Sequence, residues 1–180
     1  MTKSIKLNAS NIISIKKNID AEITKYSHII RGENVISTKA IKAGLGSGKD
    51  LKALYNLIQQ LRNKHIIIKG MLQYLNIGIT SFDYDKFKKT NYYAIFAACE
   101  AKEDITLLKM IPTINPTQKA KKGANGTGKK ETFTSAKIAQ LIHDQQLAAN
   151  KYDAALEKFN NESSIELSDN ISDIKEYLTA

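Results

Sequence analysis

The chain has 180 residues and a formal net charge of +9, with 42% hydrophobic and 25% charged residues. This length suits one domain, or one domain with appendages, and the apolar content is enough for a core, which excludes disorder throughout. No stretch approaches the roughly 18–20 apolar residues that span a bilayer, so we expect no membrane partner. The first residues, MTKSIKLNASNII, lack the apolar segment and cleavage site of a signal peptide.

Lysine carries almost all of the positive charge, since only Arg31 and Arg62 of the 27 basic residues are arginine. Lysine attracts phosphate as a hydrated point charge, whereas arginine gives the bidentate geometry of sequence-specific readout. The composition therefore favours non-specific attraction to polyanions. An AT-rich coding sequence, which favours Lys, Ile and Asn codons, explains the same bias without any partner.

The residues that usually carry catalysis or bind metals are few and scattered. Cys99 is the only cysteine, so no internal disulfide can form, and we expect the cytoplasm or a particle assembled there. It lies in the apolar run AIFAAC, which predicts a buried, unreactive thiol. His28, His65 and His143 are too far apart for metal-ligand spacing. We therefore expect no catalytic site, no cofactor and no metal.

The first expected helix runs from about Asn11 to Ile30. Ser10 is placed to cap its N-terminus, and Gly32 is placed for a left-handed cap at its C-terminus. One apolar stripe with steps of three or four residues runs along the helix: Ile12, Ile15, Ile19, Ile23, Tyr26 and Ile30.

A loop rich in small residues, 33–49, leads into the longest stripe, and the sequence SGKD from Ser47 to Asp50 predicts a capping box at the helix start. A continuous helix here would be about 40 Å long at 1.5 Å per residue. A break near Gly70 is the competing interpretation, since glycine costs about 1 kcal/mol in a helix interior. Asn76 and Gly78 end the element. The stripe consists of Leu51, Leu54, Ile58, Leu61, His65, Ile68, Leu72 and Leu75.

This second stripe is longer than a small domain is expected to cover by itself. Part of it should then pack against another copy or a protein partner. The residues expected at this assembly interface are Leu54, Leu61, His65 and Leu72.

The third expected helix runs from about Asp85 to Ala101, after a turn around Ser81 and Asp83. Acidic residues at helix starts are stabilised by the helix dipole. On that ground Asp83 with Asp85 and Glu103 with Asp104 are interpreted as capping pairs, the second pair for a short continuation (ITLLKMI) that a proline stops.

The stretch YDKFKKTNYY in this region interleaves lysines with aromatic residues. That combination serves nucleic acid through charge and base stacking, although aromatics at helical spacing also face a core. The candidate contacts with nucleic acid or an acidic partner are Lys86, Lys88 and Lys89.

Residues 112–132 contain two prolines, three glycines, five lysines and one glutamate, and we expect a flexible basic loop. Gly123 and Gly128-Lys129 fit the frame G-x-x-x-x-G-K of a phosphate loop. Lys130, however, stands where that motif needs Ser or Thr, and no apolar strand precedes it, so the basic loop is the better interpretation. The lysines expected to contact nucleic acid or an acidic partner are Lys119, Lys121, Lys122, Lys129 and Lys130.

The last expected helix starts near Ser135 and runs to about Asn160. Its stripe again has steps of three and four residues and consists of Ile138, Leu141, Gln145, Ala148, Tyr152, Ala155 and Phe159. Beyond it, residues 162–180 carry five acidic residues against Lys175, a net charge of −4, which leaves +13 on residues 1–161. This acidic segment has a short amphipathic stripe and could dock as a helix. The stripe consists of Leu167, Ile171, Ile174 and Leu178.

Strand-like alternation is scarce, so the sequence predicts an all-α fold: helical hairpins in a bundle with long amphipathic helices, a flexible basic loop and an acidic C-terminal segment. We expect a helical domain over residues 1–111, the basic loop over 112–132, a long helix packed on the same domain over 133–161, and the acidic segment over 162–180.

No motif identifies a family or a reaction. The leading hypothesis is a non-enzymatic structural or assembly protein that acts through helical packing and a basic surface, for example a component of a phage or nucleoprotein particle. Self-association or a protein partner is expected. The alternative is a non-specific nucleic-acid-binding protein, and the third hypothesis is an enzyme with an unrecognised site.

Overall fold

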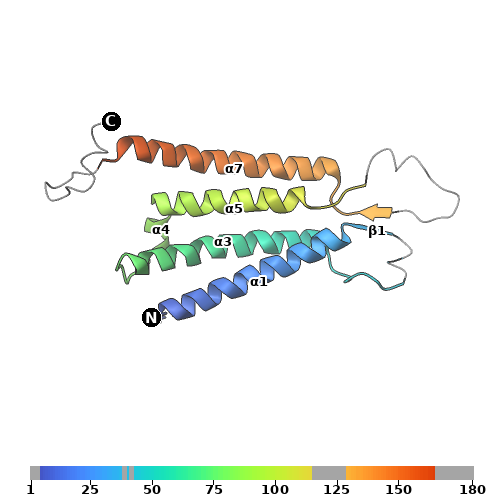
Figure 1. Ribbon diagram of the computed structural model, residues 1–180, viewed down its shortest axis with the longest axis horizontal. Helices are drawn as coiled ribbons and strands as arrows, with labels where there is room; N and C mark the ends of the chain where they lie inside the picture. Colours follow the sequence, from blue (N-terminus) through green and yellow to red (C-terminus); the bar gives the residue numbers. More distant parts are fainter. Residues whose placement is uncertain (1–4, 38–39, 41–42, 115–128, 165–180) are drawn as a thin grey trace, which may run out of the picture.

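The computed structural model describes residues 5–37, 40, 43–114 and 129–164. The fold is all-α, as the sequence predicts, with four long helices along the long axis of the molecule (Figure 1). Their bounds are α1 Ala9–Glu33, α3 Leu51–Asn76, α5 Asn91–Lys109 and α7 Ser135–Glu162. No helix in the described ranges is both long and apolar enough to cross a membrane.

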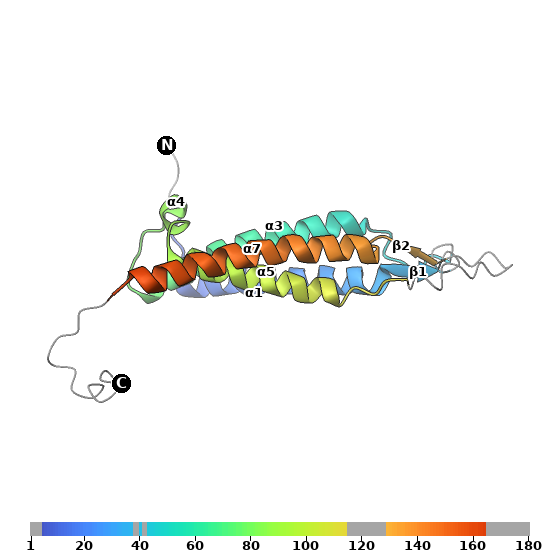
Figure 2. The same ribbon diagram turned by 90° about the horizontal axis from the view of Figure 1, so that it is seen from above.

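The helices form two antiparallel hairpins that lie side by side. Helix α1 packs on α3, α5 packs on α7, and α3 joins the two pairs through α5. Figure 1 shows the order α7, α5, α3, α1 from one edge of the molecule to the other, and Figure 2 shows the same helices from above. Helices α1 and α7 are therefore the two outer helices of an elongated bundle.

A short antiparallel ladder closes one end of this bundle. Strand β1 (Val35–Ser37) pairs with β2 (Lys129–Glu131), with Ile36 opposite Lys130. Both segments were expected in loops, so the strand at residues 129–131 shortens the expected flexible loop. Strands of three residues are too short to show alternation, and these two are far apart in the sequence.

Helix α3 is continuous through Gly70, which decides against a break there. Glycine stands at this position because the backbone of α3 lies close to α4 (Tyr84–Phe87), the one-turn helix that precedes α5. A Cβ atom at residue 70 would lie 2.4 Å from Cζ of Phe87, which is fully buried. Glycine at this position lets the Phe87 ring pack directly on the helix backbone.

The start of α1 differs from the prediction. Asn8, two residues before the predicted cap Ser10, caps α1. Its side chain accepts from the Asn11 amide at 2.8 Å, and Asn11 accepts in return from the Asn8 amide at 3.3 Å. Since asparagine is as good a cap as serine, the earlier residue satisfies the free amides first.

The end of α1 also differs, because Gly32 lies inside the helix and Asn34 is the cap residue, in right-handed conformation. The Asn34 side chain is fully buried. Its Nδ2 donates to the carbonyls of Pro112 and Phe133 at 2.7 and 2.9 Å, and its Oδ1 accepts from the Phe133 amide at 2.7 Å. These contacts fix the end of α1 against the chain before and after residues 115–128.

At the start of α3 the cap is Asp50, whose side chain accepts from the Lys52 amide at 2.9 Å. Ser47 does not cap the helix. Its amide and hydroxyl instead donate to the Glu33 carboxylate at 2.9 and 2.7 Å. The predicted capping box is therefore wrong, because Ser47 is held by α1.

The third expected helix is two helices, α4 and α5. Thr90 separates them, because its side chain caps α5 by accepting from the Tyr93 amide at 3.3 Å. Asp83 caps α4 as expected. Helix α5 then runs unbroken to Lys109, so Glu103 and Asp104 are interior helix residues and the prediction that they cap a continuation is wrong.

The apolar core has three clusters along the bundle. The largest, around Ile58 and Leu108, lies toward the strand end and includes Phe133. The second joins α1 to α3 around Ile19 and Leu61, and the third holds Phe87 between α3 and α5. The predicted stripes of α1, α3 and α7 all contribute side chains to these clusters.

Cys99 is exposed, so the expectation of a buried thiol is wrong. The run AIFAAC lies inside α5, where Ala94, Ala97 and Ala98 face the core. Cys99 and Ile95 are four residues apart and share the outward face. The flexible loop over residues 115–128 and the docking of residues 165–180 fall outside the described residues.

Candidate functional site

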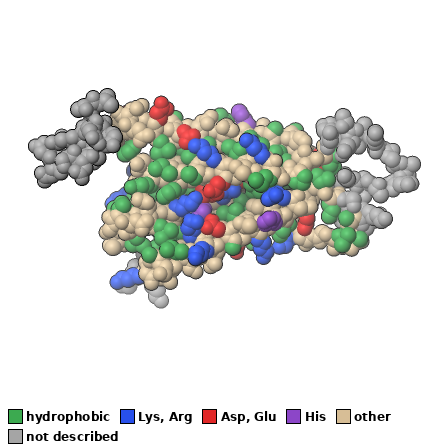
Figure 3. Space-filling view, in the orientation of Figure 1, with side chains coloured by type: hydrophobic (Ala, Val, Ile, Leu, Met, Phe, Trp, Pro, Cys, Tyr) green, Lys and Arg blue, Asp and Glu red, His purple; other side chains and the backbone are tan. Residues whose placement is uncertain are grey.

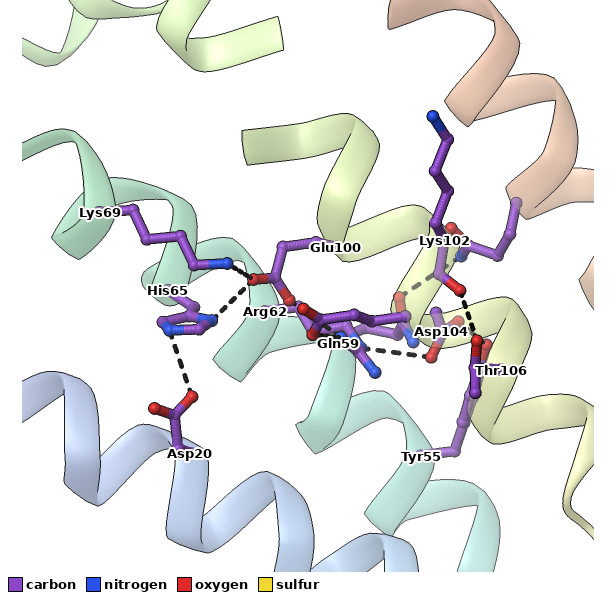
Figure 4. Close-up of polar contacts among 12 residues, drawn as sticks. Asp20, Tyr55, Gln59, Arg62, His65, Lys69, Glu100, Lys102, Asp104 and Thr106 are labelled. Atoms are coloured by element: carbon purple, nitrogen blue, oxygen red, sulfur yellow. Dashed lines mark hydrogen bonds and ion pairs between the residues drawn. The ribbon is translucent and has the colours of Figure 1, made fainter. Parts of the chain in front are cut away.

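The least ordinary feature of the bundle is a layer of charged and polar side chains inside it, shown in Figure 4. Helix α3 supplies one side of this layer, because residues three or four apart share one helix face. Glu100 and Asp104 of α5 face them, and Asp20 joins from α1. The α3 members are Tyr55, Gln59, Arg62, His65 and Lys69.

Arg62 is the hub of the layer on the α5 side. Its Nη1 donates to Glu100 Oε2 at 2.9 Å and to Glu103 Oε2 at 3.2 Å, and its Nε lies 3.3 Å from Asp104 Oδ1. The side chain of Asp104 is fully buried, and its Oδ2 accepts from the Tyr55 hydroxyl at 2.6 Å. Arg62 is itself only 6% exposed, so each of these charges is paired within the protein.

His65 links the same layer to α1. Its Nδ1 lies 2.6 Å from Glu100 Oε1, and its Nε2 lies 3.2 Å from Asp20 Oδ1. Lys69 donates to the same Glu100 oxygen at 2.8 Å, and Asp20 is also paired with Lys16 at 2.8 Å. Three helices are thus joined through one buried imidazole.

The environment shifts the pKa values of the two buried carboxyl groups, Glu100 and Asp104, in opposite directions. Burial alone would raise the pKa of Glu100, but hydrogen bonds from His65 and Lys69 and their positive charges lower it to about 2. Burial raises the pKa of Asp104, and the bond from Tyr55 and the charge of Arg62 only partly oppose the shift. Glu100 therefore holds the negative charge more firmly than Asp104 does.

The charged groups of this layer bind one another, which ties α3 to α5 and to α1. A cavity of about 190 Å³ lies beside it and is lined by Arg62, Glu100, Tyr93 and Tyr152 among others. In the described part of the chain, no group of three or more His, Cys, Asp or Glu side chains could hold a metal ion. The layer favours one alignment of the helices, because any other alignment would leave buried charges without their partners.

Sequence reasoning missed most of this layer. It placed His65 on the packed stripe, treated Asp104 as a cap, and passed over Arg62 and Glu100. A signal was present, because Arg62 is one of only two arginines and lies within the helix that has the longest apolar stripe. Glu100 and Asp104 lie four residues apart in α5, the spacing that places both on one helix face.

The predicted assembly interface lies largely in the core of this single chain. Leu54, Leu61 and His65 are 8%, 4% and 4% exposed, and Leu72 packs against the cluster between α1 and α3. Helices α1 and α5 cover the stripe that was expected to need a partner. Self-association through some other surface stays a prediction.

The lysines predicted around α4 are tied to acidic neighbours. Lys86 lies 4.0 Å from Asp83, and Lys88 lies 3.7 Å from Asp85 and over the ring of Tyr84. Phe87, the central aromatic of the stretch, is buried and cannot stack on a base. The acidic residues at α4 therefore largely balance its lysines. Lys89 is exposed and carries the remaining positive charge.

A stronger concentration of charge is attached to the strand end of the bundle. The sequence of residues 38–49 and 115–130 holds eight lysines and no acidic residue. The first segment starts after β1 and leads to the start of α3, and the second starts after Ile114 and ends in β2. We call these lysines the lysine-rich end; they are Lys39, Lys42, Lys49, Lys119, Lys121, Lys122, Lys129 and Lys130.

The sides of the bundle are different. Figure 3 shows acidic and basic side chains interspersed with apolar ones over the face of Figure 1, without a continuous basic area. Helix α7 leads from the strand end to the opposite end of the bundle, where residues 162–180 begin with their net charge of −4. The chain therefore attaches basic segments to one end of an elongated bundle and an acidic segment to the other.

In the glycine-rich turn before α3, both donors of Ser47 are already taken by a carboxylate of this chain. Gly44 and Gly48 have φ of 71° and 66°, which only glycine adopts without strain. The Glu33 carboxylate accepts from the Ser47 amide and hydroxyl of this turn. The turn leads directly into α3, whose cap is Asp50.

No family model, curated protein or solved structure matches this chain. Its function must therefore be inferred from its own residues.

Proposed function

We propose that this chain is a non-enzymatic assembly protein whose bundle is a rigid spacer and whose lysine-rich end attaches it to an acidic protein partner in a larger cytoplasmic particle. A phage or nucleoprotein particle is one setting that suits such a component. The observation that carries the proposal is the attachment of eight lysines, with no acidic residue among them, to one end of the bundle.

The build of the bundle supports a role in holding parts at a fixed separation. Its charged layer joins α1, α3 and α5 through Arg62 and His65. The ends of α1 and α7 are held by the buried Asn34. Both segments of the lysine-rich end therefore start and finish on well-packed elements, so a partner bound there would be oriented relative to the long axis.

Lysine suits this role because a hydrated point charge tolerates many geometries of an acidic surface. Such contacts steer association and weaken as salt rises. The second candidate, direct non-specific binding of nucleic acid, uses the same lysines against phosphate, and the absence of arginine from both segments favours weak sequence preference.

A gel-shift titration of the purified chain at about 50 and 200 mM salt separates the two candidates, because phosphate binding by lysine depends steeply on salt. The assembly proposal expects little binding to duplex DNA or RNA even at the lower salt, both for the full chain and after removal of the acidic segment 162–180. Five phosphate contacts would instead give a slope of log K against log salt of about −4.5 on duplex. Tight binding with that slope would overturn the assembly proposal in favour of nucleic acid.

A further inference from the structure

The end of the bundle opposite the strands exposes an unusual share of apolar side chains. The described residues expose eleven large hydrophobic side chains, and six of them belong to α4 or lie at or just beyond the termini of α1, α3 and α7 that meet at this end. Isolated exposed apolar residues are ordinary, but a group at one end of an elongated bundle indicates a covered surface. The six are Ile5, Leu7, Ile77, Ile79, Tyr84 and Phe159, with exposures of 84%, 38%, 49%, 40%, 37% and 45%.

Three of these side chains, Ile5, Leu7 and Ile79, line a groove of about 560 Å³. The residues before α1, the last turns of α3 and the segment 79–82 line it, and its walls include Met71, Tyr74 and Phe82. The only charged residue that lines it is Lys6. An occupant should therefore be apolar on one side and, at its border, acidic rather than basic.

The chain supplies a segment of this kind at the same end. Helix α7 finishes at Glu162, beside the start of α5 and at the end of the bundle where the residues before α1 lie (Figures 1 and 2). The sequence that follows has apolar residues at steps of four, three and four, which share one face of a helix: Leu167, Ile171, Ile174 and Leu178. Its acidic residues are Glu166, Asp169, Asp173 and Glu176.

We propose that residues 165–178 form an amphipathic helix that lies across this end of the bundle, with its apolar stripe on the exposed apolar side chains and in the groove. A helix of this length is about 21 Å long. Neighbouring helices pack about 8–10 Å apart, so the three spacings from α7 to α1 amount to roughly 24–30 Å. The helix and its connection to α7 together match that span.

Charge favours the same placement. The acidic face of the segment would lie near Lys6 in the groove and near the exposed Lys89 that follows α4. The segment would also stay at the opposite end of the bundle from the lysine-rich end. Its acidic charge would then not compete with an acidic partner there, and the docking does not depend on the proposed function.

Hydrogen exchange of backbone amides in the full-length chain tests this docking. The expected result is that amides of residues 167–178 exchange at least about tenfold more slowly than in a free peptide of the same sequence. The double variant Ile171→Lys/Ile174→Lys should abolish this protection and speed exchange in residues 77–82. Amides in the middle of α3 and α5 should not change.

The control is Ser168→Lys/Ser172→Lys, which adds the same charge on the polar side of the expected helix and should keep the protection. Free exchange of residues 167–178 in the wild-type chain would overturn the proposal. Protection that grows with protein concentration would also overturn it, because it would mean that a second copy fills the groove. Equal loss of protection in both double variants would show that the apolar stripe is not the contact.

Discussion

The charged layer is costly to bury, because each ion loses its hydration at a cost of several kcal/mol. Arg62, Glu100 and Asp104 offset this cost by pairing with one another and with neighbouring side chains, which are Tyr55, His65, Lys69 and Glu103. Removal of one member should therefore be far more damaging than replacement of a surface charge, since it leaves a buried charge without its partner.

Glu100→Gln should destabilise the fold by about 3–5 kcal/mol near neutral pH, because Arg62, His65 and Lys69 then lose their shared carboxylate. The pKa of Glu100 is lowered from 4.5 to about 2, so its contribution to stability is fully present above pH 4.5 and is lost as pH falls toward 2. The difference in unfolding free energy between wild type and variant should shrink over this window. Urea denaturation at a series of pH values measures it.

Glu157→Gln is the control for that series, because Glu157 is exposed on α7 and the same chemical change there should alter stability very little. Glu157→Gln and the wild type keep the same charged layer, so the opposite dependence on pH of Asp104, whose pKa is raised, cancels between these two proteins. A constant difference between wild type and Glu100→Gln from pH 7 to pH 2 would contradict the assigned role of Glu100.

Asn34→Asp should cost at least about 2–3 kcal/mol, although the two side chains have nearly the same shape, because buried groups without partners are expensive. The Nδ2 of Asn34 donates to the carbonyls of Pro112 and Phe133, and a carboxylate would face both with an acceptor. Thermal unfolding measures the loss. Asn150→Asp on the exposed side of α7 is the matched control, and equal effects of the two changes would contradict the clamp at Asn34.

At the scale of elements, the apolar stripes predicted α1, α3 and α7 to within a few residues, because the spacing of three and four residues persists over many turns. The ends were less predictable, since several residues near each end could cap and tertiary contacts decide which one does. Ser47 is the clearest example, because its donors are taken by Glu33 from another helix.

The ladder of β1 and β2 and the break at Thr90 were missed for related reasons. The ladder depends on pairing between segments that are distant in the sequence. The break depends on one threonine that caps α5 in a stretch whose aromatics still follow helical spacing. The charged layer was missed because its contacts join residues on different helices, and the spacing of residues within one helix does not show which helices meet.

Gly70→Ala should destabilise the protein by about 1–3 kcal/mol, even though alanine favours helix by about 1 kcal/mol. The new Cβ would lie 2.4 Å from the Phe87 ring and would force it from its buried site. Phe87→Leu leaves space beside residue 70, so Gly70→Ala should destabilise the Phe87→Leu protein less than it destabilises the wild type. A double-mutant cycle from urea unfolding measures this coupling, and additive effects would rule out the contact as the reason for glycine.

At the scale of the whole molecule, charge is distributed along the long axis rather than across a face. The lysine-rich end is attached at the strands, and the acidic segment follows α7 at the other end. The sequence alone predicted the lysines as contacts and the acidic segment as separate. It could not predict that their attachment points lie at opposite ends, because that follows from the packing of α5 and α7 as antiparallel neighbours.

The central claim is that the lysine-rich end binds an acidic protein partner, and co-purification from the native source with two matched variants tests it most directly. The first variant replaces five lysines of the lysine-rich end by glutamine: Lys119, Lys121, Lys122, Lys129 and Lys130. The control replaces five exposed lysines on the bundle: Lys17, Lys25, Lys64, Lys151 and Lys158.

Both variants remove the same charge, so non-specific attraction falls equally in the two. The account predicts that wild type and control retain the same acidic protein at low salt, and that the first variant loses it while keeping the helical circular dichroism and thermal unfolding of the wild type. Equal retention of that protein by both variants, or recovery of nucleic acid alone with the wild type, would contradict the claim.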